Sequence, residues 1–151
     1  MTITDLGRVG IGTTLPGALL EVNGAAVKPG GGLWSVASDE RLKEIDSEFS
    51  RGLEDLVKLN AIAYHYRDGN ELNLSSEERY IGVTAQNMAE AIPEAIVDHP
   101  SDFLHVNNEP LIWTLVNSIK ELDAKNKEAE RRNAELEERL ARVESLLAGQ
   151  Q

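Results

Sequence analysis

A short stretch early in the chain holds residue types that could break a peptide bond. It reads Ser38-Asp39-Glu40-Arg41-Leu42-Lys43. A serine becomes a nucleophile when a nearby base takes its proton. A lysine can be that base when desolvation or a neighbouring cation lowers its pKa, and Arg41 is close enough in sequence to supply such a cation. The stretch alone is a weak signal, because a helix-capping serine beside a surface lysine is far more common than a Ser–Lys dyad.

The local fold has to bring these two side chains together. The spacing of Ser38 and Lys43 does not place both on one face of a helix. Ser38 is followed by two acids, a pattern that predicts a helix N-cap, and the side chain of an N-cap residue lies outside the helix. Its hydroxyl could therefore meet a lysine from the first helical turns or from another chain, and the sequence leaves both alternatives open.

Residues 38–109 predict a small α+β body around this stretch. Apolar residues at near-helical spacing predict helices over 42–49 and 53–59, with Gly52 between them. Because only 5% of the residues are aromatic, we expect the core to be aliphatic. The other predicted elements are strands over 62–66, 80–84 and 95–97, a turn over 68–70, and a helix over 86–92 that Pro93 ends.

From Pro110 to the end, the sequence predicts one long helix with a coiled-coil seam. The a positions are Ile119, Asn126, Asn133, Leu140 and Leu147, and the d positions are Leu115, Leu122, Ala129, Leu136 and Val143. The asparagines in the a positions lower the stability of the coil, but they penalise wrong registers more strongly. A solvated single helix is the alternative interpretation.

Charged residues on both sides of the seam favour parallel chains in register. The e positions are Asp123, Glu130, Glu137 and Glu144, and the g positions are Lys125, Arg132 and Arg139. In a parallel coil each g residue faces the e residue of the next heptad on a neighbouring chain, so opposite charges meet. The stretch from Arg139 to Glu144 resembles the Arg-apolar-x-x-apolar-Glu signature of three-stranded coils, and on that resemblance we expect a homotrimer.

Residues 1–37 predict short strands broken by turns. Most of the glycines lie here, and they separate aliphatic pieces such as 9–11 and 19–22. This zone has too little apolar material to fold alone as a monomer. Residues 27–34 are expected to be a flexible lead into the body. The chain is thus divided into a β-rich N-terminal zone (1–37), the body (38–109) and a coiled-coil helix (110–151), an α+β protein overall; the resemblance given below implies that residues 1–37 are the end of a fibre stalk.

Composition excludes several classes of function. A net charge of -11 argues against binding to nucleic acid or to an anionic membrane. The absence of cysteine excludes disulfides, thiolate zinc sites and cysteine nucleophiles. His65, His99 and His105 show no ligand spacing, and Gly10-x-Gly12 lacks the rest of a dinucleotide site, so we expect no metal and no cofactor. No apolar run approaches the roughly 20 residues that span a bilayer.

The pattern Ser38-Asp39-x-Arg41-x-Lys43 resembles the signature of the self-cleaving intramolecular chaperone domains of phage endosialidase tailspikes and related tail fibres. The similarity extends along nearly the whole chain. Residues 9–16 and 20–24 resemble a fibre-stalk repeat, Tyr64-x-Tyr66, 82–87 and 92–94 resemble the central strand–helix segment, and 115–122 resemble the closing helix. One local departure is that Val83 and Thr84 stand where bulkier residues are common.

This resemblance implies a specific function. Such domains trimerise, template the folding of the upstream fibre segment of the same chain, and then cut themselves free before the motif serine, here between Ala37 and Ser38. Ser38 would be the nucleophile of this single-turnover serine endopeptidase. Lys43 would be its general base and later its proton donor, and Asp39 and Arg41 would orient or tune the dyad.

The resemblance also implies where the protein acts. We expect assembly in the host cytoplasm, the stalk on the virion tail fibre, and release of the chaperone part after cleavage. The alternative from another class is a non-cleaving trimerisation cap of a phage fibre or bacterial adhesin. A receptor-binding fibre tip is a third and weaker interpretation.

Overall fold

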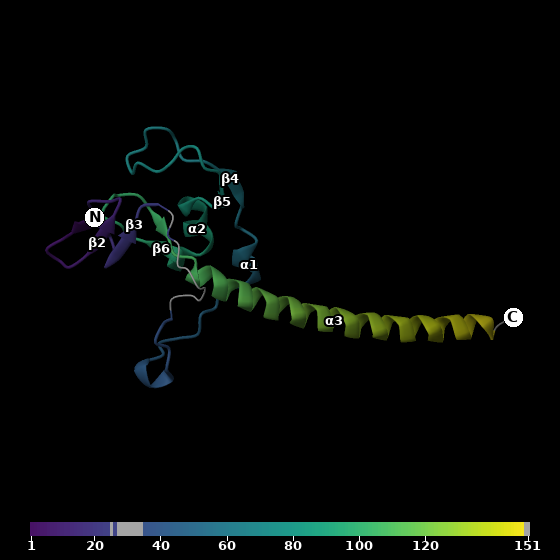
Figure 1. The fold of residues 1–151 in the computed structure, drawn as a ribbon. Coiled ribbons are helices and arrows are strands. Elements are labelled where there is room, and N and C mark those ends of the chain that lie inside the picture. Colours follow the sequence, from purple (N-terminus) through teal and green to yellow (C-terminus); the bar gives the residue numbers. More distant parts are fainter. Residues whose placement is uncertain (25, 27–34, 150–151) are drawn as a thin grey trace.

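The computed structural model describes residues 1–24, 26 and 35–149 of the chain. Three small sheets and a long C-terminal helix form an α+β arrangement, which confirms the fold class predicted from the sequence (Figure 1). The predicted flexible lead over 27–34 lies outside the described residues. Within the described part of the chain, no helix has both the length and the apolar character that a membrane crossing requires.

The N-terminal sheet consists of β1 (Thr2–Ile3), β2 (Val9–Ile11) and β3 (Leu20–Val22), in that order. β1 pairs antiparallel with β2, and β2 pairs parallel with β3. Gly12 ends β2 at φ +76, and a Cβ there would lie 2.7 Å from the Asn23 carbonyl oxygen. Only glycine fits this turn. The predicted short strands broken by glycine turns are therefore present.

The body packs short elements around a small aliphatic core. Its elements are α1 (Leu53–Leu56), β4 (Ile62–Tyr64), β5 (Tyr80–Gly82), α2 (Ala85–Ala91), the 3₁₀ turn η2 (Pro93–Ala95), β6 (Ile96–Val97) and β7 (His105–Val106). β4 pairs antiparallel with β5, and β6 pairs antiparallel with β7. The fully buried side chains are Met88, Ala91, Ile92 and Ala95.

Helix α2 forms where its sequence signals predict. Thr84 is its N-cap, and the Thr84 hydroxyl accepts the Asn87 N–H at 3.2 Å. Met88, Ala91 and Ile92 recur at helical spacing, so they share the face that enters the core. Pro93 follows directly and starts η2, because proline cannot donate the next helical hydrogen bond.

The predicted helix over 42–49 is wrong. Only a single 3₁₀ turn, η1 (Glu40–Leu42), forms here, and residues 43–52 have no regular secondary structure. Leu42 and Ile45 are 72% and 71% exposed, so the apolar residues that suggested a helix have no surface in their own chain to pack against. A short helix without such packing is not stable in water.

Other elements also differ from prediction, and the strands predicted over 62–66 and 80–84 end at Tyr64 and Gly82. The cap of η1 is Asp39, whose carboxylate accepts the Arg41 N–H, and not Ser38. The predicted helix over 53–59 is α-helical only over Leu53–Leu56. Strand β7 was not predicted, because its two residues are too few to produce an alternating pattern.

The C-terminal helix α3 (Glu109–Ala148) starts beside the body and runs away from it (Figure 1). Near its start, Thr114 and Ser118 are buried, and their hydroxyls donate to the carbonyls of Pro110 and Thr114 at 2.9 and 2.7 Å. These bonds satisfy the two buried hydroxyls within the helix itself. Every residue from Leu122 to Gly149 is exposed in the single chain.

Candidate functional site

The turn around η1 brings Ser38 and Lys43 together within one chain. Lys43 Nζ donates a hydrogen bond to Ser38 Oγ at 2.6 Å. The backbone of the turn closes this distance, because the Leu42 N–H donates to Asp39 O and the Lys43 N–H donates to Glu40 O, each at 3.0 Å. A tight 3₁₀ turn followed by extended chain thus achieves a contact that a regular helix would not make at this spacing.

Asp39 and Arg41 pair with each other inside the same turn. Arg41 Nη2 lies 2.7 Å from Asp39 Oδ2, and Arg41 Nε lies 2.9 Å from Asp39 Oδ1. The hydrogen bonds from the Arg41 side chain and then from its backbone N–H hold the pKa of Asp39 below its usual value. The Arg41 charge is therefore directed at Asp39, and the pair braces the turn that carries Ser38 and Lys43.

Solvent reaches the whole turn. Ala37, Ser38 and Lys43 are all exposed in the single chain. The segment that contains η1 forms a loop standing away from the sheets and from α2 (Figure 1). Nothing in the described part of this chain covers the Ser38–Lys43 contact.

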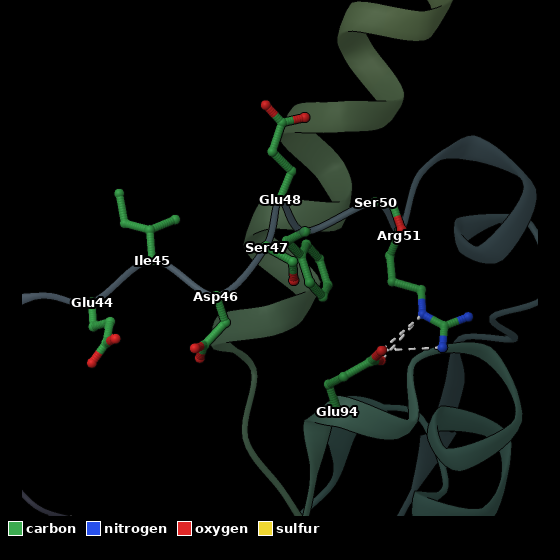
Figure 2. A pocket seen from close by; sticks show the side chains of 9 residues that line it. Glu44, Ile45, Asp46, Ser47, Glu48, Ser50, Arg51 and Glu94 are labelled. Carbon is green, nitrogen blue, oxygen red and sulfur yellow. Dashed lines mark hydrogen bonds and ion pairs between the residues drawn. The ribbon is translucent and has the colours of Figure 1, made fainter.

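Residues 44–51 form a strap that leads from this turn back to the body. Figure 2 shows the strap crossing the start of α3, with Arg51 at its end turned toward Glu94. Arg51 Nε and Nη2 each donate to Glu94 Oε1 at 3.1 Å. Burial raises the pKa of Glu94, but the hydrogen bond with Arg51 outweighs burial and leaves that pKa below its usual value. This ion pair ties the strap to η2.

Helix α3 holds the same strap through two polar side chains. Asn117 Nδ2 donates to the carbonyl oxygens of Phe49 and Arg51, both at 2.9 Å. The Glu121 carboxylate accepts the Leu53 N–H. Gly52 is buried at this crossing, and a Cβ there would overlap the Glu121 carboxylate. The sequence analysis missed this junction, although Asn117 and Glu121 stand one helical turn apart and away from the a and d positions.

The residues predicted to form the seam lie on another face of α3. Ile119, Leu122 and Leu140 are 65%, 44% and 59% exposed. In the same heptad frame Asn117 is at f and Glu121 at c, so these two contact the body while a and d stay free. The other predicted seam residues that are exposed in the single chain are Leu115, Asn126, Asn133, Leu136, Arg139, Val143, Glu144 and Leu147.

A tyrosine cluster occupies the strand pair of the body. The ring centroids of Tyr64, Tyr66 and Tyr80 lie 5.5 to 5.6 Å apart. Tyr80 Oη donates to Glu78, and this bond raises the pKa of Tyr80 to about 12. The cluster covers β4 and β5 and supplies no group to the Ser38–Lys43 contact.

Among the described residues, no group of three or more histidine and acidic side chains is placed to bind a metal ion. His65 is exposed. His99 and His105 stack on each other with ring centroids 3.9 Å apart, and His99 lies 2.9 Å from Glu21.

Residues 38–97 match the family model Peptidase_S74, described as chaperone of endosialidase. The family expected from the sequence is thereby confirmed over this segment, which starts at Ser38 and contains most of the body. The match supports a chaperone role, and the family's name suggests a serine peptidase class. No curated protein matches the chain.

Proposed function

We propose, from this family match, that the chain is an intramolecular chaperone that forms a homotrimer, templates the upstream fibre segment, and then cuts itself between Ala37 and Ser38. The observation that carries the cleavage step is the 2.6 Å hydrogen bond between Lys43 Nζ and Ser38 Oγ. The matched segment begins at the residue that would become the new N-terminus.

The proposed reaction needs only Ala37, Ser38, Lys43 and one water molecule. Lys43, as the free amine, takes the proton of the Ser38 hydroxyl while Oγ attacks the carbonyl carbon of Ala37. The bond from that carbon to the Ser38 nitrogen breaks, and Lys43 returns the proton to the departing amine. Water then hydrolyses the ester between Ala37 and Ser38 Oγ, which leaves a carboxylate on Ala37 and restores the Ser38 hydroxyl.

Trimerisation would complete this site. A lysine acts as a base when desolvation or a nearby cation lowers its pKa, whereas Lys43 is exposed here and Arg41 is paired with Asp39. We infer that a neighbouring chain covers the turn and removes water from it. Cleavage would then follow assembly and not precede it.

The faces of α3 support the homotrimer. Asn117 at f and Glu121 at c bind the strap of their own chain, and the a and d positions remain exposed and are apolar apart from Asn126 and Asn133. Exposed apolar stripes of this length are typical of association sites. Acidic e and basic g residues along the stripe favour parallel chains in register.

The chaperone role follows from what a coil does to a fibre of interwoven strands. Such a fibre has high contact order and folds slowly. Three parallel helices hold the upstream chains in register and raise their effective concentration. Removal of the template after folding takes away the easy route back, so the fibre becomes kinetically trapped. We place this process in the host cytoplasm during assembly, with the stalk on the virion tail fibre.

A denaturing gel with mass spectrometry tests the proposal. Wild type should yield one fragment ending at Ala37 and one starting at Ser38, whereas Ser38→Ala should stay full length. Ser47→Ala is the matched control, because Ser47 is another exposed serine in the following strap, and it should cut as wild type does. A wild-type chain that is trimeric by sedimentation but remains uncut would overturn self-cleavage and favour the non-cleaving cap.

A further inference from the structure

The stalk and the body touch through polar side chains on both sides of the proposed cut. Glu21 Oε2 lies 2.9 Å from His99 Nε2, and Asn23 Nδ2 donates to the Leu72 carbonyl oxygen at 2.8 Å. Glu21 and Asn23 precede Ala37, and Leu72 and His99 follow Ser38. The stalk lies beside β6 of the body, as Figure 1 shows.

The hydrogen bonds around His99 fix the direction of its contact with Glu21. The Ser101 N–H donates to His99 Nδ1 at 3.2 Å, so this nitrogen is an acceptor. Nε2 must then carry the ring hydrogen and donate it to the Glu21 carboxylate. The same Glu21 oxygen also accepts the Gly17 N–H at 2.7 Å. The carboxylate is thus held from the stalk and from the body at once.

Close packing adds shape selection to these bonds. The His99 side chain is only 10% exposed, and its ring stacks on His105. A Cβ on Gly17 would overlap the His99 ring, so the stalk backbone approaches the ring as closely as a glycine allows. A segment that binds this surface therefore needs a residue with a carboxylate and a glycine four residues before that residue.

The proposed cut lies outside this contact. Ala37 and Ser38 are exposed in the loop that stands away from the sheets, and none of the residues just named belongs to that loop. Breaking the peptide bond there removes the covalent link but none of these hydrogen bonds.

We propose that the body keeps the stalk end bound after the cut, through a docking surface formed by Leu72, His99, Ser101 and His105 that captures Glu21, Asn23 and Gly17. This inference rests on the proposed function. Cleavage and release are then separate steps, and the body leaves the fibre only when the docking surface dissociates from the stalk.

An added protease tests retention without relying on self-cleavage. In the full chain carrying Ser38→Ala, a site-specific protease sequence is inserted between the exposed residues Ser35 and Val36, and the cut protein is passed over a size-exclusion column. The stalk piece should co-elute with the body. Adding Glu21→Ala or Gly17→Ala should raise the dissociation constant of the stalk piece about tenfold. This is the effect of losing roughly one hydrogen bond to a charged group. Asp5→Asn removes another exposed stalk carboxylate and should change nothing.

The outcomes separate this inference from the proposed function. Retention by this surface is overturned if the stalk piece elutes alone from the cut Ser38→Ala chain that carries no further substitution. It is also overturned if the chains with Glu21→Ala and Gly17→Ala retain the stalk piece as tightly as the chain with Asp5→Asn does. Circular dichroism of the uncut variants establishes that the body is folded in each case. An uncut wild-type chain in the gel experiment would overturn self-cleavage and leave this result unaffected.

Discussion

The Glu121 carboxylate accepts the backbone N–H of Leu53, with both oxygens 3.3 Å from the nitrogen. This bond fastens helix α3 to the segment that follows the candidate catalytic turn. The carboxylate can lie there because Gly52 has no side chain. The proposed trimerisation helix and the proposed cleavage turn are thereby connected through one crossing of the backbone.

Replacing this glycine should loosen the crossing. Gly52→Ala would displace the Glu121 carboxylate and leave the Leu53 N–H without its partner, so we expect the free energy of unfolding to fall by about 1 kcal/mol. Urea denaturation measures this change. Gly82→Ala is the control, because a Cβ there would meet the Tyr64 ring at an ordinary 3.4 Å. Equal stability of the two variants would show that the crossing contributes nothing.

A charge in the seam should prevent association and leave the body intact. Ile119→Asp would place three carboxylates at one level of the coil, where each would lose water without a partner. We expect the association to weaken at least about a hundredfold, as measured by sedimentation equilibrium. Ala124→Asp puts the same charge at an exposed f position and should leave the trimer unchanged. A monomeric wild-type chain at micromolar concentration would contradict the seam itself.

The base role of Lys43 can be separated from its hydrogen bond. Lys43→Arg retains a cationic donor near Ser38, but a guanidinium does not give up its proton in a protein. We therefore expect both Lys43→Arg and Lys43→Met to remain uncut on a denaturing gel. Cleavage of Lys43→Arg at the wild-type rate would mean that another group takes the serine proton.

Acid should weaken the contact between stalk and body. Burial raises the pKa of Glu21, but hydrogen bonds from His99 and Gly17 outweigh it, so the bound-state pKa lies below the ordinary 4.5. The contribution is present in full above pH 4.5 and is lost as the pH falls through the bound-state pKa. Burial, together with the nearby His99, lowers the pKa of His105 below 6.5, but both groups belong to the body and stay together when the stalk leaves, so the predicted acid effect rests on Glu21.

Dissociation of the protease-cut stalk, followed as the pH falls from about 8 to about 4, measures this effect. Glu21→Ala should abolish the step below pH 4.5. Glu71 and Asp98 line one pocket together with Glu21, His99 and His105, so Glu71→Gln serves as the charge control. A profile that is flat for wild type would show that the protonation of Glu21 is not linked to the contact.

The sequence predicted the elements whose signals are local. The helix over 86–92 has a threonine cap at one end and a proline at the other, and it was placed within one residue of α2. The heptads from Pro110 likewise predicted α3 almost to its ends. These patterns decide structure by themselves because each carries its own start, stop and apolar face.

The sequence could not predict contacts made between distant segments. Leu42 and Ile45 have helical spacing, but spacing cannot reveal that the chain offers them no surface to pack on. The pairing of Arg41 with Asp39 competes with its assumed role beside Lys43, and the choice depends on the geometry of a single turn. Asn117, Glu121 and His99 contact residues so far away in the sequence that no local pattern could mark them.

The far part of α3 has a practical consequence for anyone who wishes to control this protein. Since every residue from Leu122 to Gly149 is exposed in the single chain, this part of α3 can be shortened one heptad at a time without disturbing the globular part. Each deletion would remove one heptad of the proposed seam and lower the association constant by one step. Under the proposed trimerisation, the length of α3 would set the concentration at which the chains associate.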